Sequence, residues 1–579
     1  MNLDEEILKL TCALYDHYHF CRSDVTDILE KYQRFIRDVY NPYLLNKLKS
    51  SIFNLLDDRV KRDVEDIFNR YADPFLPVSS EDKRLRLYSK LGMYDPPKLY
   101  TIQPGGDGDL DVESTESVQL LSMGVEQSFS KIFQMEGLLE ATIAHKEKML
   151  ASDSLLMSDN VQGSNCKRIL ANFKGDGIAL PLTINFDGLE PGNGMGSHAG
   201  AHALDAIYAT TCFPPEFASK LDSIVVLEVF HTKDRKKIGI EKFIARLIEE
   251  LKRVGEVGFE VIVNGKKFKI HLLLTHITGD NLGLNCILGF VCSFHNTHCC
   301  RICLAGPEEI RTMTKENPTL LRTIDNYEQG LLQSSDQTYY PEWELYLKLR
   351  DVVAVMFKPD ISLSESTQMA SDIEELLELW IDLGEVLTIK FHNLLHYLKK
   401  LRQNGPPTKN SAIRFESKHR ELKKILLAIE CNINVLQSLG VRLGLRLMRF
   451  QFQKYEGLII KYGPASENSM RFFKTEPDSF KYVTVNDFTY KIGSIIVARM
   501  DENDIEFGRI SRIYSCDAVL YFEYEAFDFI GFKRDYYAYS VIANETNIRE
   551  IKYDSLVSRT PCLSFEIDGE LYISTRYRL

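Results

Sequence analysis

Two aspartates in this sequence stand where carboxylates from separate strands could share a metal ion. Asp187 ends the apolar run LPLTINFD and precedes Gly188, and Asp280 follows the run IHLLLTHITG in the same way. Carboxylates at the strand ends of an α/β sheet can converge on a hard divalent cation such as Mg²⁺. Asp-Gly and Gly-Asp-Asn are also common turn signals, so a purely structural interpretation stays open.

A third carboxylate, Glu416, lies in the stretch SAIRFESKHRELKKILLAIE, which has helical periodicity. Phe415, Leu422 and Leu426 form an apolar stripe, whereas Glu416 shares its face with basic residues. A carboxylate on a basic face suits a site where Mg²⁺ meets a phosphate backbone. The alternative is an ordinary solvated face on which Glu416 pairs with Arg420.

Cysteines and histidines form a second candidate cluster. Cys300 and Cys303 make a C-x-x-C, and His392 and His396 lie at i and i+4 on an expected helix, so both imidazoles can face one ion. Two thiolates and two imidazoles complete a closed tetrahedral Zn²⁺ site with a structural role. A redox pair and two unrelated helix histidines are the alternatives. Cys299 has no assigned role.

The elements that position these residues can be read from periodicity. Short apolar runs at 178–187 and 222–230 predict buried strands, and 240–256 predicts an amphipathic helix. Asn264-Gly265 joins two further strands in a hairpin. Strands mixed with helix predict an α/β core, with Asp187 at the end of its strand.

The flanking segments have other patterns. A helix is expected from a Ser23/Asp24 cap, and a second begins at a capping box of Ser371 and Glu374 and ends at Gly405. Short alternating runs after about residue 475 predict a small β-barrel or sheet. The expected domains are a helical segment (1–100), a connection with helix (101–177), the first part of the core (178–304), a helical insertion (305–390), the segment with the zinc-ligand histidines and the Glu416 helix (391–470), and a small β domain (475–579).

Composition limits the protein class. The 579 residues are 44% hydrophobic and carry 70 Lys and Arg against 82 Asp and Glu, a net charge of -12, so the whole chain is no general polyanion binder. The acidic start MNLDEEILKL is unlike a secretory signal, and no run approaches the roughly 18 apolar residues that span a bilayer. We expect a cytosolic or nuclear protein whose 12 cysteines are thiols or metal ligands.

Taken together, the blocks resemble those of a known family. INFDGLEPGNGMGSH, TGDNLGLNCILGF with CCRICL, and FHNLLHYLKKLRQNGPP with IRFESKHRELKK resemble the catalytic blocks of CACTA (EnSpm-like) DDE transposases encoded by animal transposons. The resemblance covers about residues 175–430 and is weaker on either side. It rests on the order and spacing of the blocks more than on any single block.

The resemblance implies an RNase H-like catalytic core with a large helical insertion, preceded by a helical segment and followed by a small β-barrel-like domain. It implies Asp187, Asp280 and Glu416 as catalytic ligands of Mg²⁺ or Mn²⁺, active in DNA nicking and strand transfer. The family's zinc motif falls on Cys300, Cys303, His392 and His396. The candidate contacts to the DNA backbone are Arg414, His419, Arg420, Lys423 and Lys424.

The partners implied are transposon-end and target DNA, a homo-oligomer in the DNA complex, and no membrane. A nuclear location follows from that function, because KDRKK at 233–237 is too short to serve as an import signal. The sequence shows no zinc finger that would recognise transposon ends, since only Cys12 and Cys21 precede Cys166. The alternative is therefore a catalytically inactive, domesticated protein that binds DNA, chromatin or other proteins.

Overall fold

A computed structural model divides the chain into two compact units, each described here by itself. The first unit contains Met1–Asp153, Asp159–Phe294 and Asn410–Tyr455, and the second contains Ser154–Ser158, His295–Lys409 and Glu456–Leu579. The structure describes residues 3–17, 20–102, 118–152, 156–190, 203–288, 300–321, 342–358, 360–382, 386–429, 434–455, 457, 459–464, 478–486, 488–500, 504–516, 519–533, 536–567 and 569–575.

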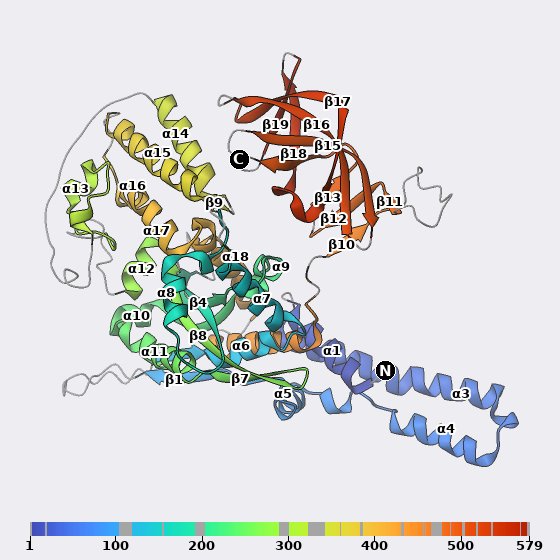
Figure 1. Ribbon diagram of the computed structural model, residues 1–579. Coiled ribbons are helices and arrows are strands. Elements are labelled where there is room, and N and C mark those ends of the chain that lie inside the picture. Colours follow the sequence, from blue (N-terminus) through green and yellow to red (C-terminus); the bar gives the residue numbers. More distant parts are fainter. Residues whose placement is uncertain are drawn as a thin grey trace, which may run out of the picture. The chain divides into compact units, whose positions relative to one another are not determined.

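A seven-stranded sheet is the centre of the first unit (Figure 1). Its strands follow one another in the order β1 (Lys98–Ile102), β2 (Val118–Ser122), β6 (Val225–His231), β5 (Leu204–Thr211), β4 (Ile178–Leu189), β8 (Lys266–Gly279) and β7 (Phe259–Val263). Strands β4 and β8 are parallel, and the other neighbours are antiparallel. Strands far apart in sequence, β4 and β8, therefore lie side by side in the middle of the sheet.

Helices cover both faces of this sheet. One core packs Ile207 and Leu227 against α6 (Val125–Phe133) and α11 (Glu241–Glu256). The other packs Tyr208 and Val229 against α18 (Ile413–Leu427) and α19 (Val435–Leu447). The first unit is thus a three-layer α/β/α arrangement, because neighbouring strand residues point to opposite faces. Its remaining helices beside the sheet are α7 (Leu138–Leu150), α8 (Ser164–Asn172), α9 (Pro215–Ala218), α10 (Thr232–Ile238) and α12 (Asn281–Ile287).

The strongest local signals of the sequence are confirmed. Helix α11 spans the expected residues and buries Phe243, Leu247 and Val254. The hairpin between β7 and β8 turns at Asn264 and Gly265, whose φ angles are +48° and +76°. Two successive positive φ angles are what a two-residue primed turn needs, and Asn-Gly adopts them at low cost.

Three strands of the sheet were missed. Strand β5 is buried on both faces, so its residues show no alternation between apolar and polar side chains. Strands β1 and β2 lie where we expected loop and helix; β2 is a short run, VQLLS, and β1 lies at the sheet edge. Pairing with distant strands, rather than local pattern, makes these segments extended.

The N-terminal 100 residues are mainly helical, as expected. They form α1 (Leu3–Asp16), α2 (Arg22–Arg34), a π-helical segment (Phe35–Tyr40), α3 (Asn41–Ser51), α4 (Asp58–Arg70) and α5 (Glu81–Lys90). The cap of α2 lies two residues earlier than expected, because the Cys21 backbone N–H donates to the Asp24 carboxylate over 2.6 Å. Helix α1 packs on α19 through Tyr15 and Leu445.

The second unit begins with helices. They are α13 (Pro307–Thr312), α14 (Glu342–Met356), α15 (Leu363–Asp382), α16 (Ile389–His392) and α17 (Tyr397–Asn404), with a 3-10 turn at Asn393–His396; β9 (Ile361–Ser362) pairs with β3 (Leu156–Met157). The predicted capping box at Ser371 and Glu374 was wrong. Helix α15 begins eight residues earlier, where Ser362 and Glu365 exchange backbone-to-side-chain hydrogen bonds of 2.7 and 3.1 Å.

A closed six-stranded barrel ends the second unit and confirms the prediction of a small β-barrel. Its strands are β14 (Ile495–Met500), β15 (Ile505–Cys516), β16 (Val519–Lys533), β17 (Ala538–Lys552), β18 (Ser558–Ile567) and β19 (Glu570–Ser574), and the pairing of β15 with β16 closes it. Strand β11 (Asp478–Phe480) adds to β15, and β10 (Ile460–Tyr462), β12 (Tyr482–Val485) and β13 (Phe488–Lys491) form a small separate sheet. Among the helices described, none is both long and apolar enough to cross a bilayer.

Candidate metal centres

Asp187 and Asp280 lie on the two adjacent parallel strands of the first unit. Phe186 of β4 is in register with Gly279 of β8, so the two aspartates are the next residues along neighbouring strands. We expected Asp187 at the end of its strand. Strand β4 instead continues to Leu189, paired with β5. Asp280 does follow the last residue of β8. The pairing of β4 with β8 thus places both carboxylates at the same end of these two strands.

Each aspartate also has a local structural task. The Gly188 backbone N–H donates to Asp187 Oδ1 over 2.8 Å. Asp280 stands before the first residue of α12, and its Oδ1 accepts the Gly283 N–H as a helix cap. These bonds use Oδ1 of each carboxylate, so they fix the side chains without engaging both oxygens of either group.

Glycines make room for Asp280 beside β4. A Cβ on Gly283 would lie 2.9 Å from Asp280 Oδ1 and 3.1 Å from the Phe186 carbonyl oxygen, and one on Gly279 would lie 2.8 Å from that same carbonyl. Real Cβ atoms do not approach backbone oxygens so closely. The GDNLG sequence therefore allows α12 to start directly against β4.

Glu416 lies in the first turn of α18, one turn before His419, whose Nδ1 is 3.6 Å from Asp187 Oδ2. Phe415, Leu422, Ile425 and Leu426 bury the opposite face of this helix in the core, as the predicted stripe requires, while Glu416 is exposed. The packing of α18 on the sheet sets where its polar face points.

The negative charges of Asp280 and Glu416 act on Asp187. Burial raises the pKa of Asp187 to about 6, the Gly188 N–H opposes that rise, and the negative charges of Asp280 and Glu416 add to it. Like charges held near one another favour a bound proton or a bound cation. Among the described residues, the group whose ligand atoms all lie within 4.8 Å of one another is a different one, formed by Cys300, Cys303, His392 and His396.

Two of the five expected DNA contacts are held by neighbouring groups of the protein. His419 is only 8% exposed; its Nδ1 lies 3.6 Å from Asp187 Oδ2, and burial lowers its pKa to about 4, so it is neutral near pH 7. Arg414 donates to the Ala218 carbonyl and, over 3.1 Å, to Ser223 Oγ. Both side chains are turned toward neighbouring protein groups, and their role as contacts to a DNA backbone stays a prediction.

The other three basic residues lie at the surface of α18. Arg420 and Lys424 are exposed, and Lys423 is half-buried. Arg420 follows Glu416 by one helical turn, so both lie on the same face.

A buried Cys₂His₂ group in the second unit could bind a metal. The ligand atoms of Cys300, Cys303, His392 and His396 all lie within 4.8 Å of one another, and all four residues are buried. Cys303 Sγ is 3.1 Å from His392 Nε2, and Cys300 Sγ is 3.5 Å from His396 Nε2. Hydrogen bonding from Cys303 and from both imidazoles holds the pKa of the Cys300 thiol well below its ordinary value. Cys299 lies outside the described residues.

One supporting residue of this group was not anticipated. Glu316 Oε1 lies 2.6 Å from Nδ1 of His396, which leaves Nε2 facing the thiols. Carboxylates behind metal-ligating histidines fix the ring orientation in the same way. No sequence spacing identifies Glu316, since it contacts His396 only through the fold. The two histidines lie on successive short helical turns rather than on one long helix.

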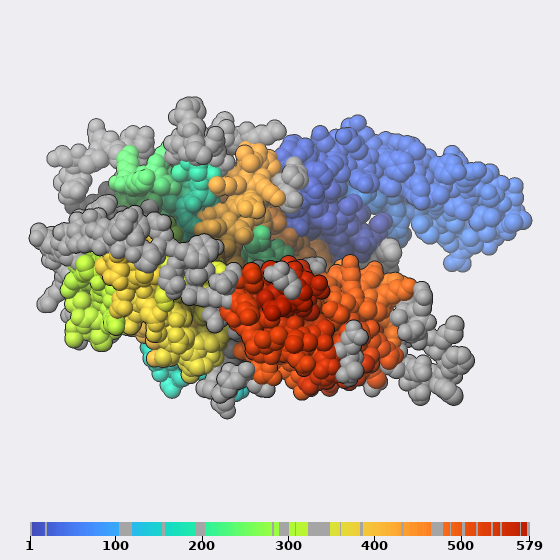
Figure 2. Space-filling view, turned by 90° about the horizontal axis from the view of Figure 1, so that it is seen from above, coloured from blue at the N-terminus to red at the C-terminus, as the bar shows by residue number. Residues whose placement is uncertain are grey.

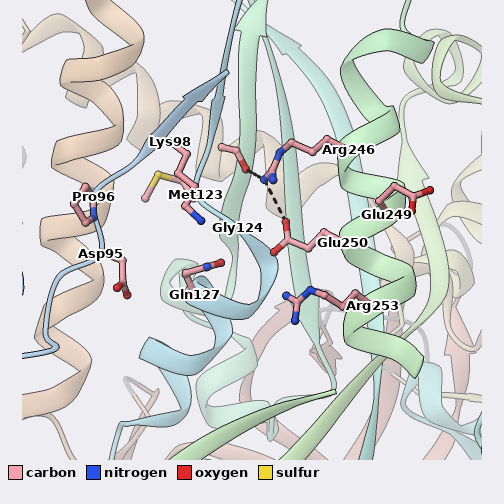
Figure 3. Close-up of a pocket in the computed structure, with 11 residues that line it drawn as sticks. Asp95, Pro96, Lys98, Met123, Gly124, Gln127, Arg246, Glu249, Glu250 and Arg253 are labelled. Carbon is pink, nitrogen blue, oxygen red and sulfur yellow. Dashed lines mark hydrogen bonds and ion pairs between the residues drawn. The ribbon is translucent and has the colours of Figure 1, made fainter. Parts of the chain in front are cut away.

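A cavity of about 430 Å³ lies elsewhere in the first unit, between β2, α6 and α11 (Figure 3). Its charged side chains largely satisfy one another: Arg246 donates to Ser122 and Glu250, and Arg253 pairs with Glu126. Glu250 in turn accepts the Val125 N–H at the start of α6. Such internal pairing leaves no clear preference for an anionic or a cationic ligand, so we assign this cavity no function.

Near this cavity lies Glu228, a fully buried acid whose two carboxyl oxygens have no hydrogen-bond partner. Burial raises its pKa to about 8, with Arg246 opposing and Glu250 adding to the rise. The protonated Glu228 side chain contributes to the free energy of unfolding. This contribution is complete below the unfolded pKa of roughly 4.3 and is lost as pH rises through 8. We expect Glu228→Gln to match wild type near pH 4.5 and to exceed its unfolding free energy by about 1–4 kcal/mol at pH 9.

Denaturant midpoints at the two pH values measure this difference. Glu249→Gln is the matched control, because Glu249 is on the same side of the sheet but exposed and paired with Lys252. A stability difference between Glu228→Gln and wild type that stays constant with pH would contradict the assignment.

Neither a protein-family model nor a curated protein sequence matches this chain.

Proposed function

We propose that the first unit is the catalytic core of a CACTA-like DDE transposase and that Asp187, Asp280 and Glu416 hold its divalent cations. The observation that carries this proposal is the register of β4 with β8, which makes Asp187 and Asp280 the next residues along two neighbouring strands. Burial, with smaller contributions from the charges of Asp280 and Glu416, raises the pKa of Asp187 to about 6. These residues are widely separated in sequence and come from β4, the end of β8 and α18. Three carboxylates brought together at the expense of mutual repulsion are typical of a metal site.

The sheet order supports this proposal. The antiparallel strands β4, β5 and β6 with β8 parallel to β4 are compatible with an RNase H-like core. The additional strands β1 and β2 extend one edge, and the antiparallel β7 lies at the other.

In the proposed reaction the protein positions DNA rather than forming a covalent intermediate. Bound Mg²⁺ or Mn²⁺ would supply an activated water or 3′-hydroxyl and stabilise the leaving oxygen at phosphorus. Asp187, Asp280 and Glu416 fix where this chemistry takes place. Arg420, Lys423 and Lys424 extend from the Glu416 helix as contacts to the phosphate backbone, which are independent of base sequence.

We propose that Cys300, Cys303, His392 and His396 bind Zn²⁺. Thiolate and imidazole ligands in a closed, buried group are typical of structural zinc. All four ligands belong to the second unit, where the ion would pin residues 300–303 to residues 392–396 and so fix both ends of the intervening segment.

The test is incubation of the full chain with terminal-repeat DNA and Mg²⁺ or Mn²⁺. Nicking followed by strand transfer is the expected result. DNA binding without cleavage under either metal would instead favour the inactive, domesticated protein. A functioning transposase would also be expected to enter the nucleus and to assemble as an oligomer on DNA.

A substitution next to Asp280 tests the geometry of the site. Gly283→Ala would push a Cβ against Asp280 and the Phe186 carbonyl, so we expect nicking to fall about tenfold or more because the carboxylate moves. The apparent Mg²⁺ requirement should rise in the same titration. Gly255→Ala in α11 is the control, since its Cβ would meet only ordinary contacts of 3.5 Å or more. Equal activity of both variants would argue against Asp280 as a ligand.

A further inference from the structure

Helices α3 and α4 form a hairpin in the blue N-terminal part of the first unit (Figure 1), and this part protrudes at one end of the space-filling view (Figure 2). Neither helix contains a buried residue. The two helices pack on each other, and Asn41 Nδ2 donates to the Tyr71 carbonyl oxygen to tie the hairpin ends together.

Packing within the hairpin covers apolar side chains on only one side of each helix. Leu44, Leu48, Val64 and Phe68 are half-buried along the seam between α3 and α4. Beyond that seam, large apolar side chains point into solvent: Tyr40, Tyr43, Ile52, Leu55, Val60, Ile67 and Tyr71 are 38–82% exposed. Tyr40 and Tyr43 lie one turn apart on one helix face, and Val60 and Ile67 lie two turns apart on another.

The exposed area is close to what a stable interface needs. At about 150–250 Å² for a whole aromatic side chain, and less for an aliphatic one, these seven residues leave roughly 600 Å² in water. A standard protein interface buries about 800 Å² on each partner, and patches above about 400 Å² mark interaction sites.

The charges of the hairpin suit a second copy of itself. Residues 41–71 carry six basic and five acidic side chains, a net charge of +1, although the whole chain carries -12. Lys49 pairs with Glu65 inside the hairpin. Lys47 on α3 and Asp63 and Asp66 on α4 have no ion pair within the described residues. A two-fold axis would bring α3 of one copy to α4 of the other and pair these opposite charges.

We propose that two copies of this chain dimerise through the α3–α4 hairpin, forming a four-helix bundle without DNA. A lone pair of helices shares one seam, whereas four helices enclose a core of side chains from all of them. The dimer would be independent of the carboxylate and cysteine-histidine centres, since none of their residues belongs to the hairpin.

Sedimentation of the full chain without DNA tests the dimer. Wild type is expected to sediment at twice the chain mass at micromolar concentration. Tyr43→Glu with Ile67→Glu should weaken dimerisation by at least about tenfold, because both charges enter the apolar core. Val257→Glu is the matched control, since Val257 is 62% exposed at the end of α11 and should leave the dimer intact.

A charge exchange makes the test specific. Lys47→Glu and, separately, Asp63→Lys with Asp66→Lys should each weaken self-association, and a mixture of the two variants should restore a dimer. Circular dichroism verifies folding, and the milder Tyr43→Ser with Ile67→Ser replaces any variant that loses helix. A monomeric wild type, or a dimer insensitive to all hairpin variants, would overturn the proposal. An Asp187→Asn protein that still dimerises separates this result from the catalytic proposal.

Discussion

Asp187→Asn, Asp280→Asn and Glu416→Gln are each expected to lower Mg²⁺-dependent DNA nicking by at least about 10³-fold. Each change removes one negative ligand while keeping the side-chain shape. In Asp187→Asn the amide oxygen can still accept the Gly188 N–H, so the local backbone has no reason to move. Single-turnover cleavage of terminal-repeat DNA measures the effect, because it separates the chemical step from product release.

Loss of activity in Asp187→Asn would not come from unfolding. Burial and the nearby negative charges raise the pKa of Asp187 to about 6, so its contribution to the stability of the metal-free wild type is complete below the unfolded pKa of about 3.9 and is lost as pH rises through 6. The asparagine side chain does not ionise, so the variant does not lose stability at this position as pH rises. Without metal it should be as stable as wild type at pH 4 and about 1–3 kcal/mol more stable at pH 8.

Asp176→Asn is the control for the carboxylate variants. Asp176 precedes β4 but is 86% exposed and pairs with Lys269, so its loss should leave nicking unchanged. Unchanged nicking in Asp187→Asn would eliminate the catalytic assignment. Wild-type protein that binds DNA but never cleaves it would make the non-catalytic alternative the better interpretation.

Cys300→Ser is expected to release the metal and to lower the melting temperature of the second unit on the order of 10 °C. Binding of structural zinc contributes directly to folding, and the four ligands here are buried where an unpaired charge is costly. Elemental analysis of wild type should find about one Zn²⁺ per chain. The variant should contain far less, and scanning calorimetry measures its stability.

Cys562→Ser is the matched control for the zinc centre. Cys562 belongs to the same unit and its thiol is partly buried, but its nearest polar contact is the Thr560 carbonyl rather than another cysteine or a histidine. It should retain full zinc content. A wild-type chain that contains no metal and is fully stable would reject the zinc proposal and leave Cys300 and Cys303 as ordinary buried thiols.

Features set by short stretches of chain could be predicted from the sequence. The Asn264-Gly265 hairpin, helix α11 and the apolar stripe of α18 depend on turn chemistry and periodicity within a few residues. The C-x-x-C and the i, i+4 pair of histidines are also short-range patterns. The structure brings these two pairs into one group able to bind a metal.

Other features depend on contacts between distant segments. Helix α15 begins at Leu363, directly after Ile361 and Ser362 pair with the distant strand β3, although Ser371 and Glu374 have an equally good local pattern. Strand β5 is extended because β4 and β6 pair on both sides of it. Propensity could not decide either case, because competing local patterns had similar strength.

By itself the sequence determined which residues of this protein carry the candidate chemistry: three carboxylates, two thiols and two imidazoles at suggestive spacings. Only the tertiary structure decided what surrounds them. It turned His419 toward Asp187 and Arg414 toward the Ala218 carbonyl, placed Glu316 behind His396, and left every residue of α3 and α4 at least partly exposed. The physical reason is that spacing along the chain sets local geometry, whereas burial, pKa and hydrogen-bond partners depend on groups that only folding brings together.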